Sequence, residues 1–151
     1  MKILWLRVAA RLAWALAAAA CSLTLLTPAQ AAGFTPADEK NVRAVVQNQL
    51  AALAQDDATK AFSFAAPNVR EAVGTATQFL AMIRRSYPAI YRPASTAFLK
   101  PEGQDDSAIQ RVQMEDADGN VWLATYSLNR QKNRVWRITG CQVVPTKGRM
   151  A

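Results

Sequence analysis

The sequence predicts an α+β domain in which N-terminal helices pack on a curved antiparallel sheet of about four strands. Two patterns indicate this fold class. Between residues 36 and 87, apolar residues recur at intervals of three and four, the spacing of one helix face. Between residues 93 and 144, apolar and polar residues alternate, the spacing of strands that bury one face. Helices followed by a meander of strands are typical of α+β domains.

The first 31 residues have the three-part organisation of a secretory signal peptide. Basic side chains precede an uncharged run over residues 12–26, and an Ala-Gln-Ala site ends at Ala31. We therefore expect export, cleavage between Ala31 and Ala32, and a single periplasmic or secreted domain over residues 32–151. An uncleaved membrane anchor is the alternative, although the apolar run is short for a span.

Cys21 offers a second interpretation of this segment, a lipoprotein anchored through that cysteine. Small residues precede Cys21, but the apolar run continues beyond it instead of giving way to a polar tether, which favours cleavage after Ala31. Cleavage would leave Cys141 as the one cysteine, so the mature chain could form no intrachain disulfide and would keep no membrane span.

The composition excludes several classes of catalytic site. The chain has no histidine and two cysteines. Ser-His-Asp triads, Cys-His pairs, zinc sites with histidine and four-cysteine zinc sites are therefore excluded. Loss of three basic residues with the signal peptide lowers the formal net charge from +7 to +4. This mild positive charge gives no indication of nucleic-acid binding, and we expect neither a metal nor a cofactor.

A first helix is expected from about residue 36 to residue 54. Thr35 and Asp38 have the spacing of a capping box, and Pro36 occupies the first helical position. One face of this helix is expected to be buried: Val42, Val45, Val46, Gln49, Leu50 and Leu53.

Shorter helices are expected between Asp57 and Pro88. Asp57 caps the first of them, which stops before Pro67, and a further turn ends at Gly74. A capping box at Thr75 opens the last helix, which Pro88 terminates.

Four strands are expected in the second half of the domain. Their ranges are 93–100, 109–115, 121–130 and 135–144. Connections are expected at 103–106, 116–120 and 131–133. Alternation places one set of side chains on an inward face that the helices must cover: Val112, Met114, Trp122, Ala124, Tyr126, Leu128, Trp136 and Ile138.

This layout resembles the nuclear transport factor two-like α+β cone, in which a sheet wraps a long helix and leaves a pocket. In its residues the chain resembles a bacterial exported family known as domain of unknown function 4864, over nearly all of residues 34–145. The stretches that carry the resemblance are Phe34–Asp38, Ala65–Pro67, Phe79–Met82, Tyr87-Pro88, Tyr91–Ser95, Gln110–Gln113, Trp122–Tyr126, Trp136–Ile138 and Gly140-Cys141. The resemblance implies the cone fold and no particular activity.

Three details of the second half have competing interpretations. The alternating acids at 116–120 are like those of a calcium loop, but flanking strands favour a hairpin turn. Arg130 is expected at a solvated hairpin tip together with Lys132 and Arg134, an anionic partner being the alternative. Burial of Cys141 as a structural thiol would need a β-bulge, for which Gly140 is the natural site.

An enzyme of the cone type would need a carboxylate base facing the pocket, with a tyrosine to stabilise an enolate. Tyr126 is on the inward face, but no Asp or Glu occupies an inward strand position. An isomerase or dehydratase is therefore an alternative, and a non-catalytic binding or interaction module is favoured.

The segment from Tyr87 to Pro93 is the candidate ligand site. Tyr87, Tyr91 and Arg92 lie between two prolines near the presumed mouth of the cone. With the inward Tyr126, Trp122 and Trp136, they predict an apolar pocket for an amphiphile whose acidic head binds Arg92.

Two alternatives to this site stay open. The tyrosines could seal the edge of the core while Arg92 pairs with a carboxylate of the chain. The domain could also be an envelope-assembly partner that uses the outer face of its sheet, and the sequence does not indicate an oligomeric state.

Overall fold

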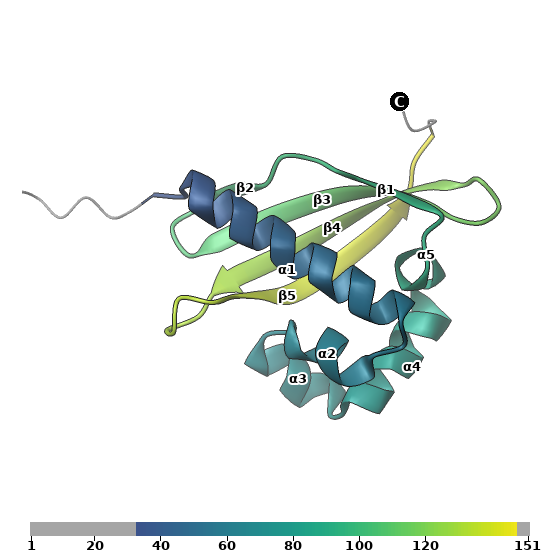
Figure 1. Cartoon of the computed structure of the whole chain (residues 1–151), viewed down its shortest axis with the longest axis horizontal. Coiled ribbons are helices and arrows are strands. Elements are labelled where there is room, and N and C mark those ends of the chain that lie inside the picture. The colour runs from purple at the N-terminus through teal and green to yellow at the C-terminus, as the bar shows by residue number, and fades with distance from the viewer. Residues whose placement is uncertain (1–32, 148–151) are drawn as a thin grey trace, which may run out of the picture.

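The computed structural model describes residues 33–147, which fold into helices on one face of an antiparallel sheet (Figure 1). The helices are α1 Pro36–Ala54, α2 Ala58–Ser63, α3 Pro67–Val73, α4 Ala76–Ser86 and α5 Pro88–Tyr91. The strands are β1 Ser95–Phe98, β2 Glu102–Gln104, β3 Ser107–Glu115, β4 Val121–Arg130 and β5 Trp136–Pro145. The expected signal peptide, its cleavage site and Cys21 lie outside the described residues. In the described part, no helix combines the length and apolarity needed to cross a membrane.

Helix α1 has the predicted boundaries and lies across one face of the sheet (Figure 1). Both halves of the capping box are present: Asp38 N donates to Thr35 Oγ1 at 3.2 Å, and Thr35 N donates to Asp38 Oδ2 at 3.0 Å. These bonds satisfy amides that the first turn leaves without helical partners.

Helices α2 to α5 gather at one end of the sheet (Figure 1). Gly74 ends α3 at φ +95°, a backbone conformation that favours glycine because a side chain there would be strained. Pro88 lies beyond the end of α4 as predicted, but it also opens α5. The passage from helix to strand that we expected at Pro88 therefore contains an extra helical turn.

The sheet order is β1-β3-β4-β5, with β2 pairing along the other half of β3. The predicted α+β class is confirmed, and the cone-like comparison stays a prediction. Strand β2 was missed because its Glu-Gly-Gln sequence has no apolar alternation and all three residues are exposed. Residues 103 and 104, predicted to lie in a connection, belong to β2, and the connection is the turn at Asp105 and Asp106.

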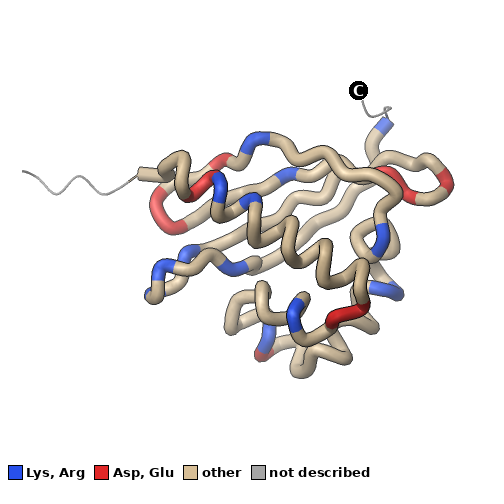
Figure 2. Tube along the Cα trace, viewed as in Figure 1, with Lys and Arg blue, Asp and Glu red and all other residues tan. Residues whose placement is uncertain are grey.

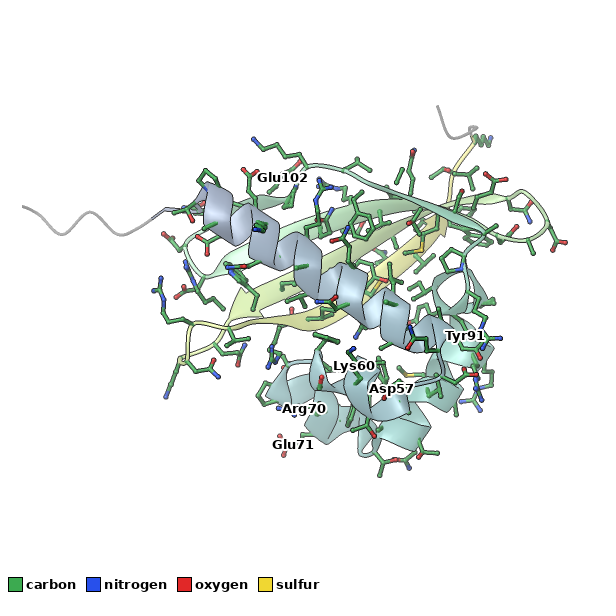
Figure 3. All side chains as sticks on the ribbon, viewed as in Figure 1. Asp57, Lys60, Arg70, Glu71, Tyr91 and Glu102 are labelled. Atoms are coloured by element: carbon green, nitrogen blue, oxygen red, sulfur yellow. The ribbon has the colours of Figure 1, made fainter. Side chains whose placement is uncertain are left out.

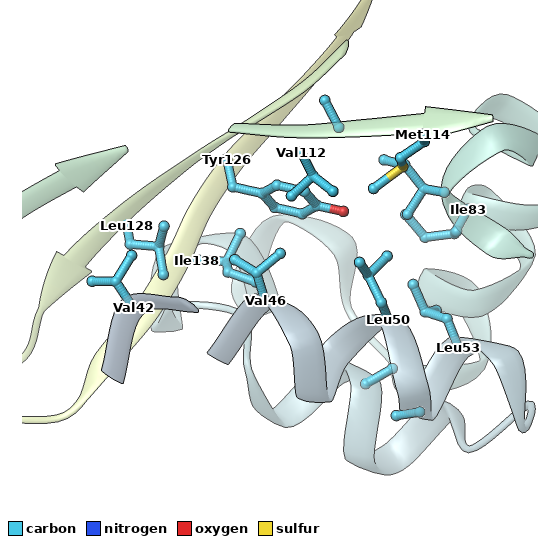
Figure 4. Packing of buried hydrophobic residues seen from close by; sticks show 14 of the residues in the cluster. Val42, Val46, Leu50, Leu53, Ile83, Val112, Met114, Tyr126, Leu128 and Ile138 are labelled. Carbon is cyan, nitrogen blue, oxygen red and sulfur yellow. The ribbon is translucent and has the colours of Figure 1, made fainter. Parts of the chain in front are cut away.

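The core lies between α1 and the inner face of the sheet (Figure 4). Val42, Val46 and Leu53 of α1 have no exposed surface, and neither have their strand counterparts Val112 and Leu128. Burial of each such side chain contributes about 1.5–3 kcal/mol to folding, so this contact fixes α1 on the sheet.

A β-bulge interrupts β5 opposite Ser127 and Leu128, which pair with Gly140 and Ile138. Thr139 is the extra residue, one position before the glycine that we expected. The shift turns Cys141 inward, opposite Tyr126, as the predicted bulge required. Cys141 is half-buried, and burial raises the pKa of its thiol to about 12, with the nearby Tyr126 hydroxyl opposing that shift.

Candidate functional site

A cavity of about 180 Å³ lies where α3, α4 and α5 meet the bulged part of β5. It is lined by Gln49, Ala65, Val69, Phe79, Met82, Ile83, Tyr87, Ile90, Tyr126, Ile138, Thr139, Gly140 and Cys141. Most of these side chains are apolar, and the described residues among them include none that is charged.

Helix α4 supplies the apolar wall opposite the sheet. Phe79 and Ile83 are four residues apart and face the core, whereas Met82 is half-buried beside them. On the sheet side, the bulge at Thr139 displaces β5 from regular pairing with β4. The helices cover the sheet face that the alternation of apolar residues predicts to be buried. The cavity lies where α3 and α4 meet the bulged strand β5.

Two polar groups at the cavity, the amide of Gln49 and the phenol of Tyr126, belong to buried residues. Gln49 of α1 is 4% exposed, and its Nε2 donates to the Ala61 carbonyl oxygen at 3.2 Å. Tyr126 is 1% exposed, and within residues 33–147 its hydroxyl has no hydrogen-bond partner. Burial raises the pKa of Tyr126 well above its usual value, with the neighbouring Cys141 adding to the shift. Tyrosine and thiol are therefore both neutral.

The described wall of the cavity supplies no group suited to abstracting a proton. A general base must take a proton near neutral pH, and none of the described lining residues is a carboxylate or a histidine. Nor do residues 33–147 contain a group of three side chains suited to holding a metal ion. An apolar cavity with a few fixed polar groups is the usual form of a small-molecule site.

The predicted Tyr87–Arg92 segment is divided between two environments. Tyr87 lines the cavity, whereas Arg92 and Tyr91 turn toward Asp56 at the end of α1. Arg92 Nη2 lies 2.8 Å from Asp56 Oδ2, and the Tyr91 hydroxyl donates to the same carboxylate. Of the two alternatives for Arg92, pairing with a carboxylate of the chain is the one observed.

Asp56 is the centre of a surface cluster. Arg84 Nη2 lies 2.7 Å from Asp56 Oδ1, and the guanidinium groups of Arg84 and Arg92 lie 5.2 and 4.8 Å from the centre of the Tyr91 ring. Figure 3 shows Tyr91 at the end of the molecule that α4 and α5 occupy. The hydrogen bond from Tyr91, followed by that from Arg84, lowers the pKa of Asp56.

The two tryptophans of the predicted site lie away from the cavity. Trp122 is half-buried, and its Nε1 donates to Asp116 Oδ2 at 2.9 Å beside the β3–β4 hairpin. Trp136 is 2% exposed, and its Nε1 donates to Asp38 Oδ1 at 3.2 Å near the start of α1. Of the six predicted residues, the structure brings only Tyr87 and Tyr126 to the cavity.

The remaining wall was not predicted. Val69, Phe79 and Met82 read as ordinary core positions of short helices, because nothing in their spacing shows a hollow behind them. Gln49 is the residue from which a polar site in the core could have been predicted. It lies within an apolar stripe of the helix, and a buried glutamine needs hydrogen-bond partners.

The prediction that Arg130 lies at a solvated hairpin tip is wrong. Figure 2 shows basic residues along the β4–β5 hairpin, but the Arg130 side chain is 6% exposed. Its Nη1 lies 3.0 Å from Asp38 Oδ1 and its Nε 2.7 Å from Asp106 Oδ1. Lys132 and Arg134 are exposed as predicted.

The acidic segment at 116–120 is the predicted hairpin turn. Asp116 Oδ1 accepts from the backbone amides of Asp118 and Asn120 at 3.0 and 2.9 Å, and Gly119 adopts φ +81°. Hydrogen bonds from Trp122 and then Asn120 lower the pKa of Asp116 to about 2.

Comparison with known proteins gives a family match. The family described as "Domain of unknown function (DUF4864)" matches residues 35–151. No curated protein matches the chain. One similar solved structure is described as a "known function protein from Kribbella flavida DSM 17836". It has 18% sequence identity and a TM-score of 0.45, over 68% of this chain and 84% of that chain. A likeness at this level carries no argument about function.

Proposed function

We propose that this chain, which belongs to the family described as domain of unknown function (DUF4864), is an exported module that binds a small, mostly apolar molecule. The observation that carries the proposal is the cavity of about 180 Å³ between the helices and β5. Export rests on the signal-peptide pattern of the first 31 residues.

The cavity suits a molecule of one or two small rings. An apolar protein cavity of roughly 150 Å³ binds benzene, because the ligand gains contacts that water would not supply. The walls here are of the same chemical kind, with Phe79, Ile83, Ile90 and Ile138 among them. Val69 and Met82 are half-buried, so the part of the wall that α3 and α4 supply is partly exposed to solvent.

The expected acidic head has little support from the geometry. Arg92 is not part of the cavity wall, and its guanidinium already binds Asp56. An ionised group in the cavity would lose hydration without gaining a described countercharge, which is costly. The proposal therefore keeps the apolar part of the sequence-based prediction and places no acidic head in this cavity.

Binding of indene, a rigid apolar bicycle, tests the proposal. We expect saturable binding to the full chain in a ligand-observed NMR titration. Val69→Trp should fill part of the cavity and weaken indene binding about tenfold or more, because the larger side chain occupies volume that the ligand needs. Val73→Trp is the matched control: Val73 is also half-buried on α3 but does not line the cavity.

Circular dichroism would establish that both variants keep the native fold. Absence of saturable indene binding to the parent chain would overturn the proposal. So would equal weakening by the two tryptophan substitutions, because binding would then not depend on the cavity.

A further inference from the structure

We infer that the ligand of this cavity carries a neutral hydrogen-bond donor, a ring N–H or a phenolic O–H, which Gln49 Oε1 accepts. The inference rests on the proposed function and names the class of molecule that the cavity selects. It follows from the orientation of one buried amide.

The orientation of the Gln49 amide is fixed by its partner. The Ala61 carbonyl oxygen can only accept, so the atom 3.2 Å from it is the amide nitrogen. The amide oxygen must therefore point away from Ala61. Gln49 occupies the buried stripe of α1 one turn before Leu53, so α1 holds the amide at a fixed depth in the core.

The amide oxygen is accessible although the residue is buried. Among residues 33–147, the sealed side-chain polar atoms that have no partner are Gln110 Oε1 and the Tyr126 hydroxyl. Gln49 Oε1 is not one of them, and no described donor bonds to it. It therefore keeps accessible surface, and the 180 Å³ cavity is the hollow whose wall includes Gln49.

The chemistry of the wall selects the form of the donor. An amide oxygen accepts a hydrogen bond and repels a carboxylate, and no described lining residue would neutralise an ammonium group. A neutral N–H or O–H group on an apolar ring meets both requirements. Indoles and phenols are molecules of this class.

Indole and indene provide the test because they have nearly the same shape and differ in one ring position, N–H against CH₂. Titrations of both would be made with the parent chain and with Gln49→Met, which keeps the side-chain length and removes the amide. We expect the substitution to weaken indole binding roughly 3- to 10-fold, the effect of one neutral hydrogen bond. Indene binding should change less than about twofold.

Loss of the bond to Ala61 could unfold Gln49→Met, so a second measurement uses the parent chain. In a crystal structure with indole, the ring nitrogen should lie within hydrogen-bond distance of Gln49 Oε1. A ring nitrogen turned away from Gln49 would overturn the inference.

The outcomes separate the two proposals. If neither indole nor indene binds the parent chain, the proposed function fails. If both bind and Gln49→Met affects them equally, the cavity is a binding site and the donor inference fails. Tighter binding of benzoate than of indole would also overturn the inference, because it would show that the site prefers an anion.

Discussion

The two ends of the contact between α1 and the sheet differ in how far their buried polar groups are hydrogen-bonded. At the start of α1, Asp38 accepts hydrogen bonds from Thr35 N and Oγ1 at 3.0 and 2.7 Å, Arg130 at 3.0 Å and Trp136 at 3.2 Å. The Trp136 ring is covered by Phe34 and by the Arg130 guanidinium, which lie 5.9 and 5.0 Å from its centre. At this end, the buried carboxylate is held by donors of the described fold.

The other end of α1 keeps a cavity and an acceptor that the described protein does not use. Gln49 Oε1 has no described donor, and Val46 and Leu50 on the same stripe pack toward the inner sheet face beside Tyr126 (Figure 4). The contrast separates structural polar groups from ligand-binding ones. Asp38 is held by donors from three elements of the fold, whereas half of the Gln49 amide remains available to another molecule.

Arg130→Ala, which removes the partner of Asp38 at the start of α1, should cause the largest loss of stability. It leaves Asp38 buried without its cation, and breaking such a buried pair costs about 3–5 kcal/mol. The free energy of unfolding from urea titration would measure the loss. Lys132→Ala, on the same hairpin but exposed, is the control and should change stability by less than about 0.5 kcal/mol. Equal losses in the two variants would contradict the structural role of Arg130.

Acidification should weaken the interactions of Asp38 at the start of α1 and so lower the stability of the fold. Burial alone would raise the pKa of Asp38, but hydrogen bonds from Thr35 and Trp136 and the charge of Arg130 outweigh it and lower the pKa. A carboxyl with a lowered folded-state pKa stabilises the fold above about pH 4. That stability is lost as the pH falls through the folded-state value.

Urea titrations between about pH 5 and pH 2 would measure this loss. Asp38→Asn should be less stable at neutral pH and should lose less stability on acidification than the parent chain. Asp118→Asn, in the exposed hairpin turn, should keep the pH dependence of the parent. An unchanged pH dependence in Asp38→Asn would show that Asp38 does not govern the acid response.

The features that the sequence predicts depend on residues close together in the chain, whereas the features that it misses depend on contacts between distant residues. The boundaries of α1 follow from Thr35, Pro36 and Asp38, whose interactions are local, and alternation gave the long strands because each buries one face. Arg130 was misplaced because its partner Asp38 is 92 residues away. The pairing of Arg92 with Asp56 spans 36 residues, and no spacing rule anticipates such contacts.

The candidate site was predicted in part for the same reason. Alternation placed Tyr126 on the inner face, and the bulge prediction brought Cys141 inward with it. The cavity itself depends on how α3 and α4 pack against β5, which is a property of the assembled layers. Only Tyr87 and Tyr126 of the predicted ligand-binding residues line it.

Tyr126→Phe should have the smallest effect on stability. Its hydroxyl is buried, and the neighbouring Cys141 thiol is at most a weak hydrogen-bond partner, so its removal should be neutral or stabilise the fold by up to about 1 kcal/mol. Thermal unfolding would measure the change. A loss of more than about 1 kcal/mol would show that the hydroxyl makes a bond that stabilises the core.

The location of bound indene tests the central claim most directly. Intermolecular NOEs between indene and the full chain, recorded on methyl-labelled protein, would identify the contacting side chains. We predict NOEs to the methyl groups of Val69, Met82 and Ile83, which line the cavity from α3 and α4. NOEs confined to the outer face of the sheet, for example to Leu123 and Val144, would contradict the account.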